Sequence, residues 1–200
     1  MIKRLVRLVL FACSVWPAYA AYDDGLISRG EYEWYVEWFS DTLVVDGGGA
    51  NVMEARNFSR IEVQSTSSPL GTGVGGIMDL VLGGYSRLDY YDGETEELTI
   101  GQNAKAYLYG GRIDAISNAQ NANFPRIFIY AQEGWSWTYE AGKIRGITGS
   151  WYDGTNLNIR FNPYWEDEYP PAWKNIQVIT PEPATLLLMA LGGMLLRRGH

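Results

Sequence analysis

The chain has 200 residues, with 16 Lys and Arg against 23 Asp and Glu and a net charge of −7. Its single cysteine, Cys13, and its single histidine, His200, lie near the two ends of the chain. The stretch 21–180 therefore has no disulfide, no Ser-His-Asp or Cys-His catalysis and no ordinary zinc or haem site. It carries 11 Lys and Arg against 22 Asp and Glu, and this acidic balance argues against nucleic acid or anionic membrane surfaces as partners.

Residues 1–20 are predicted to be a secretory signal peptide. Three basic residues within the first seven positions precede an apolar stretch from 8 to 16. Ala18 and Ala20 form an A-x-A signal, so we expect signal peptidase to cut after Ala20. Cys13 leaves lipidation as an alternative, although its surroundings match a lipid-attachment signal poorly.

Residues 21–180 are the size of a single domain and have the texture of a β protein. In 22–42, aromatic and acidic residues alternate at a spacing that fits a strand or a helix. We interpret this segment as a cap on one end of a β core. Residues 42–45 then predict a short strand, which the Asp-Gly-Gly-Gly run at 46–49 is expected to end.

A repeated pattern follows, with copies that we start at Asn57, Gly84 and Asn103. Each copy contains a turn residue, a basic residue and an alternating strand, and short apolar runs lie between the copies. Unequal repeats with short strands favour a β-solenoid, in which parallel strands stack. An antiparallel β-sandwich is the alternative.

Alternate apolar positions of these strands are predicted to fill the interior, while their neighbours face water. The residues assigned to the interior are Val44, Met53, Ile61, Val63, Met78, Leu80, Leu82, Leu88, Leu98, Ile100, Leu108 and Ile113. The charged neighbours expected to face water are Glu62, Asp79, Asp89 and Asp114. A slip of one residue would bury these carboxylates, so the strand register should be strongly specified.

Trp135, Trp137 and Tyr139 alternate strictly, which predicts a strand with three aromatic rings on one face. We favour a place for these rings in the core. A surface on which sugar rings stack is the alternative.

No catalytic residue and no firm cofactor site is predicted. Asp92 and Glu94 lie in an oxygen-rich turn and are weak calcium candidates, but they match no known calcium loop. A polysaccharide-degrading enzyme would need two carboxylates about 5–10 Å apart in an aromatic-lined groove, which sequence proximity cannot establish.

The final residues, 181–200, combine three features in a fixed order. Pro181-Glu182-Pro183 comes first, an uncharged apolar run follows, and Arg197-Arg198 comes near the end. Two prolines around one residue exclude a helix interior and leave an extended, accessible segment. A run of thirteen residues makes a helix of about 20 Å, short for a bilayer core of about 30 Å. The arginine pair would prefer the cytoplasmic side of a membrane.

This order resembles the PEP-CTERM sorting signal, which exosortase processes in bacteria with an outer membrane. The resemblance covers the tail alone and implies export, temporary anchoring in the inner membrane and cleavage near Pro181-Glu182-Pro183. Together with the composition, it leads us to expect a non-enzymatic protein of the cell surface or extracellular matrix, structural or adhesive, with exopolysaccharide as a candidate partner. A carbohydrate-binding module and a polysaccharide-active enzyme are the alternatives.

Overall fold

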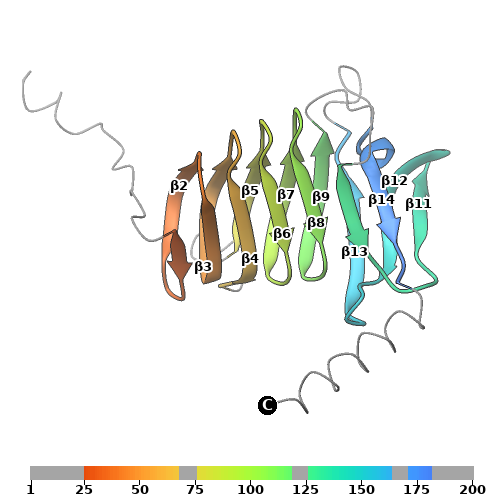
Figure 1. Ribbon diagram of the computed structural model, residues 1–200. Coiled ribbons are helices and arrows are strands. Elements are labelled where there is room, and N and C mark those ends of the chain that lie inside the picture. Colours follow the sequence, from red (N-terminus) through yellow and green to blue (C-terminus); the bar gives the residue numbers. More distant parts are fainter. Residues whose placement is uncertain (1–24, 68–75, 119–125, 164–170, 182–200) are drawn as a thin grey trace, which may run out of the picture.

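The structure is a computed structural model that describes residues 25–67, 76–118, 126–163 and 171–181. These residues form fourteen strands and one short 3-10 helix, without an α-helix, so the expected all-β fold is confirmed. The strands stand side by side along the length of the molecule (Figure 1). No described helix has the length and apolar character needed to cross a membrane. The signal segment 1–20, for which we also expected a helix, and the expected helix of the apolar run after Pro183 both lie outside the described residues.

The strands pair in two series that share the long strand β3 (Thr42–Ala55). We call the first series sheet A; besides β3 it contains, in spatial order, β1 (Leu26–Ser28) at one end and then β4 (Arg60–Thr66), β6 (Arg87–Tyr90), β8 (Lys105–Leu108), β10 (Ile127–Tyr130) and β14 (Ile176–Ile179). Sheet B contains β2 (Tyr32–Trp38), then β3, β5 (Ile77–Leu82), β7 (Glu94–Ile100), β9 (Arg112–Asn118), β13 (Asn156–Phe161), β12 (Lys143–Ser150) and β11 (Ser136–Glu140). All pairs are parallel except β11–β12 and β12–β13, so the sheet as a whole is mixed.

The glycine run after Val45 does not end a strand, contrary to the prediction. β3 continues through it and passes from sheet A into sheet B. A Cβ atom on Gly48 would lie 2.5 Å from Ile27 Cγ2, and one on Gly49 would lie 2.3 Å from the carbonyl oxygen of Gly76. These glycines therefore allow neighbouring chain segments to approach the corner of β3 from both sides.

The repeated pattern is a structural repeat, because parallel pairing aligns Arg60 with Arg87 and Arg87 with Lys105. The third copy begins one residue earlier than we expected. Its left-handed turn residue is Gln102, with φ of 52°, equivalent to Asn57 with φ of 57°. Gln102 was not recognised as the turn residue of the third copy, because glutamine is uncommon at positive φ.

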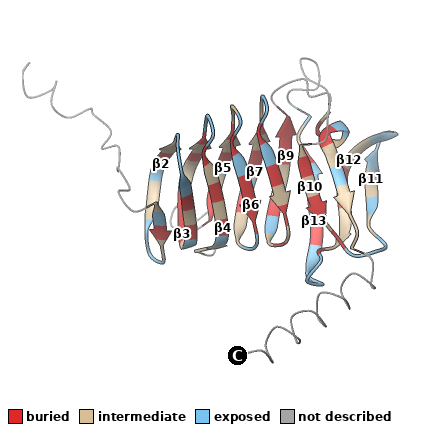
Figure 2. Ribbon diagram, in the orientation of Figure 1, coloured by how far each residue is buried: buried red, intermediate tan, exposed pale blue. Residues whose placement is uncertain are grey.

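Residues buried on both sheets form one hydrophobic core cluster (Figure 2). Ten of the twelve predicted interior residues belong to it, but Val44 and Met78 are only half-buried. Leu43 and Ile77 are fully buried in their place. Asp89 is a further correction, because this carboxylate is buried although it lies on the outward side of its strand.

A bend shared by four strands of sheet B explains the error at Met78. In each strand, two consecutive residues that are not buried stand between buried ones, which interrupts the alternation of the pleat. These pairs are Asn51-Val52, Met78-Asp79, Glu96-Glu97 and Asp114-Ala115. The bend brings adjacent side chains to the outer surface and places Glu96 and Glu97 together there.

The two ends of the strand series differ. At one end, the aromatic segment after residue 24 forms β1 and β2, which pair with β3 and leave Trp34 76% exposed. At the other end, the β11–β12 hairpin extends sheet B beyond β13, and the 3-10 helix η2 (Ala172–Asn175) leads into β14. The ambiguous spacing of the first segment thus resolves to strands.

Candidate functional site

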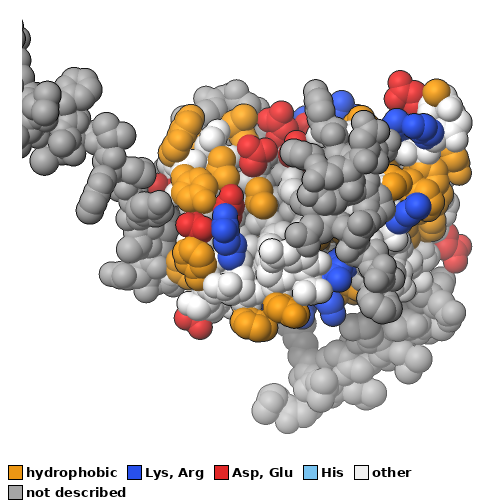
Figure 3. All heavy atoms as spheres, turned by 90° about the horizontal axis from the view of Figure 1, so that it is seen from above, with side chains coloured by type: hydrophobic (Ala, Val, Ile, Leu, Met, Phe, Trp, Pro, Cys, Tyr) orange, Lys and Arg blue, Asp and Glu red, His pale blue; other side chains and the backbone are white. Residues whose placement is uncertain are grey.

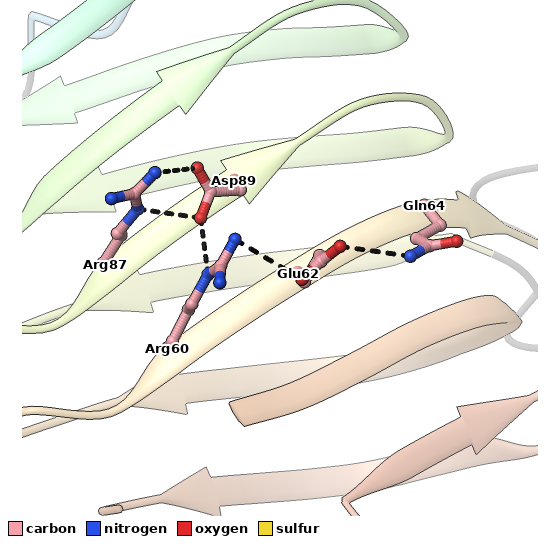
Figure 4. Close-up of polar contacts among 5 residues, drawn as sticks. All are labelled: Arg60, Glu62, Gln64, Arg87 and Asp89. Atoms are coloured by element: carbon pink, nitrogen blue, oxygen red, sulfur yellow. Dashed lines mark hydrogen bonds and ion pairs between the residues drawn. The ribbon is translucent and has the colours of Figure 1, made fainter. Parts of the chain in front are cut away.

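The outer face of sheet A carries an ion-pair network around the buried carboxylate of Asp89 (Figure 4). Arg87 donates to both oxygens, from Nε to Oδ2 over 2.8 Å and from Nη2 to Oδ1 over 2.7 Å. Arg60 on the neighbouring strand donates from Nε to Oδ2 over 2.7 Å and also lies 3.5 Å from Glu62. Two in-register arginines would repel each other, and the carboxylate that they share offsets this repulsion.

Stacked aromatic rings occupy the next positions on the same face. Tyr109 lies between Tyr91 and Tyr130, with ring centroids 5.0 and 4.5 Å away and interplanar angles of 9° and 23°. Tyr107 stacks on Phe128 at 4.9 Å, and the guanidinium of Arg87 covers the Tyr107 ring at 4.4 Å. Burial, together with the nearby Tyr130 and Asp89, raises the pKa of Tyr109 to about 12.

These stacks hold the strands together and are a poor platform for a sugar. A pyranose packs against the face of an aromatic ring, but the two faces of Tyr109 are already covered by neighbouring tyrosines. Stacked rings at the spacing of adjacent strands present their edges to solvent. The aromatic face of sheet A is therefore structural in character.

Sheet B contains an open groove of about 820 Å³. Its floor is the outer surface of β7, β9 and β13, and its wall is the β11–β12 hairpin. Ala115 lies in the floor, in register between Glu97 and Arg160, and its small side chain leaves space between those two longer ones. Seen from above in Figure 3, the molecule shows hydrophobic side chains mixed with charges of both signs.

Glu97 is held in a defined position on the groove floor. Its Oε1 accepts hydrogen bonds from Ser117 Oγ and from Asn162 Nδ2, the latter over 3.1 Å. Asp79 lies beside Glu97 in register on β5. The pKa of Asp79 is raised, first by burial and then by the charges of Glu97 and Glu96. The two adjacent carboxylates thus lie in different surroundings. Glu97 accepts hydrogen bonds from Ser117 and Asn162, whereas Asp79 is affected by burial and by neighbouring negative charge.

The three aromatic residues predicted on one face divide between core and groove. Trp135 and Trp137 pack partly buried against the core and meet edge to face at 5.2 Å. Trp137 also lies 6.0 Å from the ring of Phe161. The β11–β12 register shifts between Thr138 and Tyr139, and Tyr139 is 65% exposed at the groove. Strict alternation within one strand could not reveal this irregularity, because it depends on the pairing with β12.

The calcium candidates lie at the turn that leads into β7. Asp92 Oδ1 accepts a 2.7 Å hydrogen bond from the Gly93 amide, and Glu94 lies 3.8 Å from Arg112. Within the ranges that the structure describes, no three acidic, His or Cys side chains gather as metal ligands would. The calcium assignment remains a prediction from the sequence.

Most sorting and cleavage residues fall outside the described ranges. Ala18 and Ala20, Glu182 and Pro183, and the pair Arg197-Arg198 are not described. Pro181 is described; it is half-buried and follows the last strand, β14, after the single residue Thr180.

Sequence reasoning missed the groove, because its residues come from separate segments. Glu97 comes from β7, Tyr139 from β11 and Arg160 from β13. The one available signal was the adjacent pair Glu96-Glu97, which interrupts an otherwise alternating strand. Comparison with known protein families, curated proteins and solved structures found no match to this chain.

Proposed function

We propose that this protein is exported and serves as a non-catalytic structural or adhesive module outside the cell, sorted by its tail. The observation that carries the proposal is the order of Pro181-Glu182-Pro183, apolar run and Arg197-Arg198. Its position supports the proposal, because Pro181 comes directly after the residue that follows β14. A processing enzyme could therefore reach the triplet without opening a strand.

We also propose that the body winds as a β-solenoid rather than as an antiparallel sandwich. Consecutive strands β4 to β9 alternate between the two sheets, and each pairs in parallel with the strand two positions along the chain. An antiparallel sandwich would be built from hairpins, which here are represented by β11–β12 and β12–β13. A coil with ladders of stacked rings and ion pairs suits a durable extracellular module.

The sorting proposal is tested by Glu182→Ala in a host that contains an exosortase. We expect the wild-type protein to lose residues 1–20 and the tail, whereas the variant loses residues 1–20 but keeps its tail and stays with the membrane. Glu140→Ala, a matched change on the exposed hairpin, should be processed like the wild type. Mass spectrometry of the cell fractions reads both ends. An intact chain in the cytosol, or identical processing of Glu182→Ala, would contradict the proposal.

A further inference from the structure

The groove on sheet B has the size and lining of a site for an organic ligand. Its volume of about 820 Å³ lies within the range of about 300–1,000 Å³ that is usual for small-molecule sites. It is formed by rigid parts of the fold, since its floor consists of paired strands and its wall is a paired hairpin.

The groove floor presents hydrogen-bonding groups of both kinds. Glu97 is an acceptor, and the hydrogen bonds that it accepts from Ser117 and Asn162 both end on Oε1. Arg160 is an exposed donor on β13, and Ala115 separates it from Glu97 in the register. An acceptor and a donor on either side of a small residue can bind separate hydroxyl groups of one ligand, since each hydroxyl can donate and accept.

The groove wall presents an aromatic ring. Tyr139 is 65% exposed, unlike Tyr109 of sheet A, both of whose faces are covered by stacking. The β11–β12 register shifts between Thr138 and Tyr139, and Tyr139 lines the groove, whereas Trp135 and Trp137 pack against the core. An accessible ring can pack against the apolar C–H face of a pyranose, while polar groups bind its hydroxyls.

The charge of the groove indicates which kind of sugar it suits. Three carboxylates and three basic side chains line it, so their formal charges cancel. Glu140 and Lys143 lie directly opposite each other at the hairpin end, a position where opposite charges are favourable. An acidic polysaccharide would find no excess of positive charge here, on a chain with a net charge of −7. A neutral ligand rich in hydroxyl groups fits better.

We propose that this groove binds a neutral oligosaccharide, with one sugar ring packed on Tyr139 and hydroxyl groups held by Glu97 and Arg160. This binding site would specify the adhesive role proposed above. It rests on the proposed export in one respect, which is that the protein meets such a sugar outside the cell. Binding leaves every covalent bond of the sugar intact.

Calorimetric titration of the full chain in mild detergent tests the site, with cellohexaose, xylohexaose and mannohexaose as neutral probes and hexagalacturonate as the acidic one. We expect at least one neutral probe to bind and Tyr139→Ala to weaken it at least tenfold. Tyr139→Phe, which keeps the ring, should bind within about twofold of the wild type, and Arg160→Ala should bind at least fivefold more weakly. Tyr85→Ala is the matched control, because Tyr85 is 60% exposed but stacks on Phe58 far from the groove lining.

Three results would overturn the inference: no heat with any neutral probe at millimolar concentration, equal weakening by Tyr85→Ala and Tyr139→Ala, or tighter binding of hexagalacturonate than of every neutral probe. Release of new reducing ends from the bound probe would overturn its non-catalytic character. Since the Glu182→Ala assay reads localisation without any sugar, failure of binding and failure of sorting are distinguishable.

Discussion

Replacing Asp89 with Asn should destabilise the protein strongly for a residue on the outer face of a sheet. The Asp89 side chain is only 1% exposed and accepts three hydrogen bonds of 2.7–2.8 Å from two arginines. The variant leaves Arg60 and Arg87 side by side without their shared anion. Breaking a buried ion pair costs about 3–5 kcal/mol. We take the lower end, about 3 kcal/mol, because the arginine side chains are 39% and 49% exposed and regain water.

Urea denaturation followed by tryptophan fluorescence measures this loss. With a slope of about 2 kcal/mol per molar urea, a loss of about 3 kcal/mol lowers the midpoint by about 1.5 M. Asp114→Asn is a closely matched control, because Arg112 lies two residues before Asp114, as Arg87 lies before Asp89. Arg112 donates from Nε and Nη2 to the two oxygens of Asp114 over 2.8 and 3.0 Å. That pair is exposed, at 58% and 26%, so its loss should cost less than about 1 kcal/mol. Equal losses in the two variants would refute the role of burial.

Two further predictions concern the tyrosine stack and the strand turns. Tyr109 should titrate near its raised pKa of about 12 rather than 10. Between these two pH values the folded protein keeps a proton that the unfolded chain loses. The free energy of unfolding should therefore fall as the pH rises from about 10 to 12. Urea midpoints at pH 9 and 11 check this, and an undiminished loss in Tyr109→Phe would contradict it. Gly84→Ala should cost about 2 kcal/mol, because φ is +65° and the new Cβ would lie 2.6 Å from the Asn57 backbone nitrogen. Gly142→Ala, at φ +77° with nothing within 4 Å, should cost less in the same assay, and a reversed order would contradict the steric argument.

The strand repeats could be predicted because their signals are local. Alternation of apolar and polar residues specifies which side of a strand faces the core, and turn residues separate the strands. The alignment of Arg60 with Arg87 follows from that pattern and is confirmed by the pairing. Two errors arose where the chain departs from a regular pleat, at Met78 in the sheet B bend and at Gly48 in the corner of β3. At such positions the conformation depends on a neighbouring segment of the chain, which the local sequence does not show.

The sequence by itself determined the all-β class and the absence of Cys and His from residues 21–180. The sorting signal remains a prediction from the sequence. Only the tertiary structure decided that Asp89 is buried between two arginines, and that Glu97, Tyr139 and Arg160 share one groove. The physical reason is the same in both cases. These surroundings come from strands separated in the chain, and a local pattern describes a residue's own strand but not the side chains that the neighbouring strands place around it.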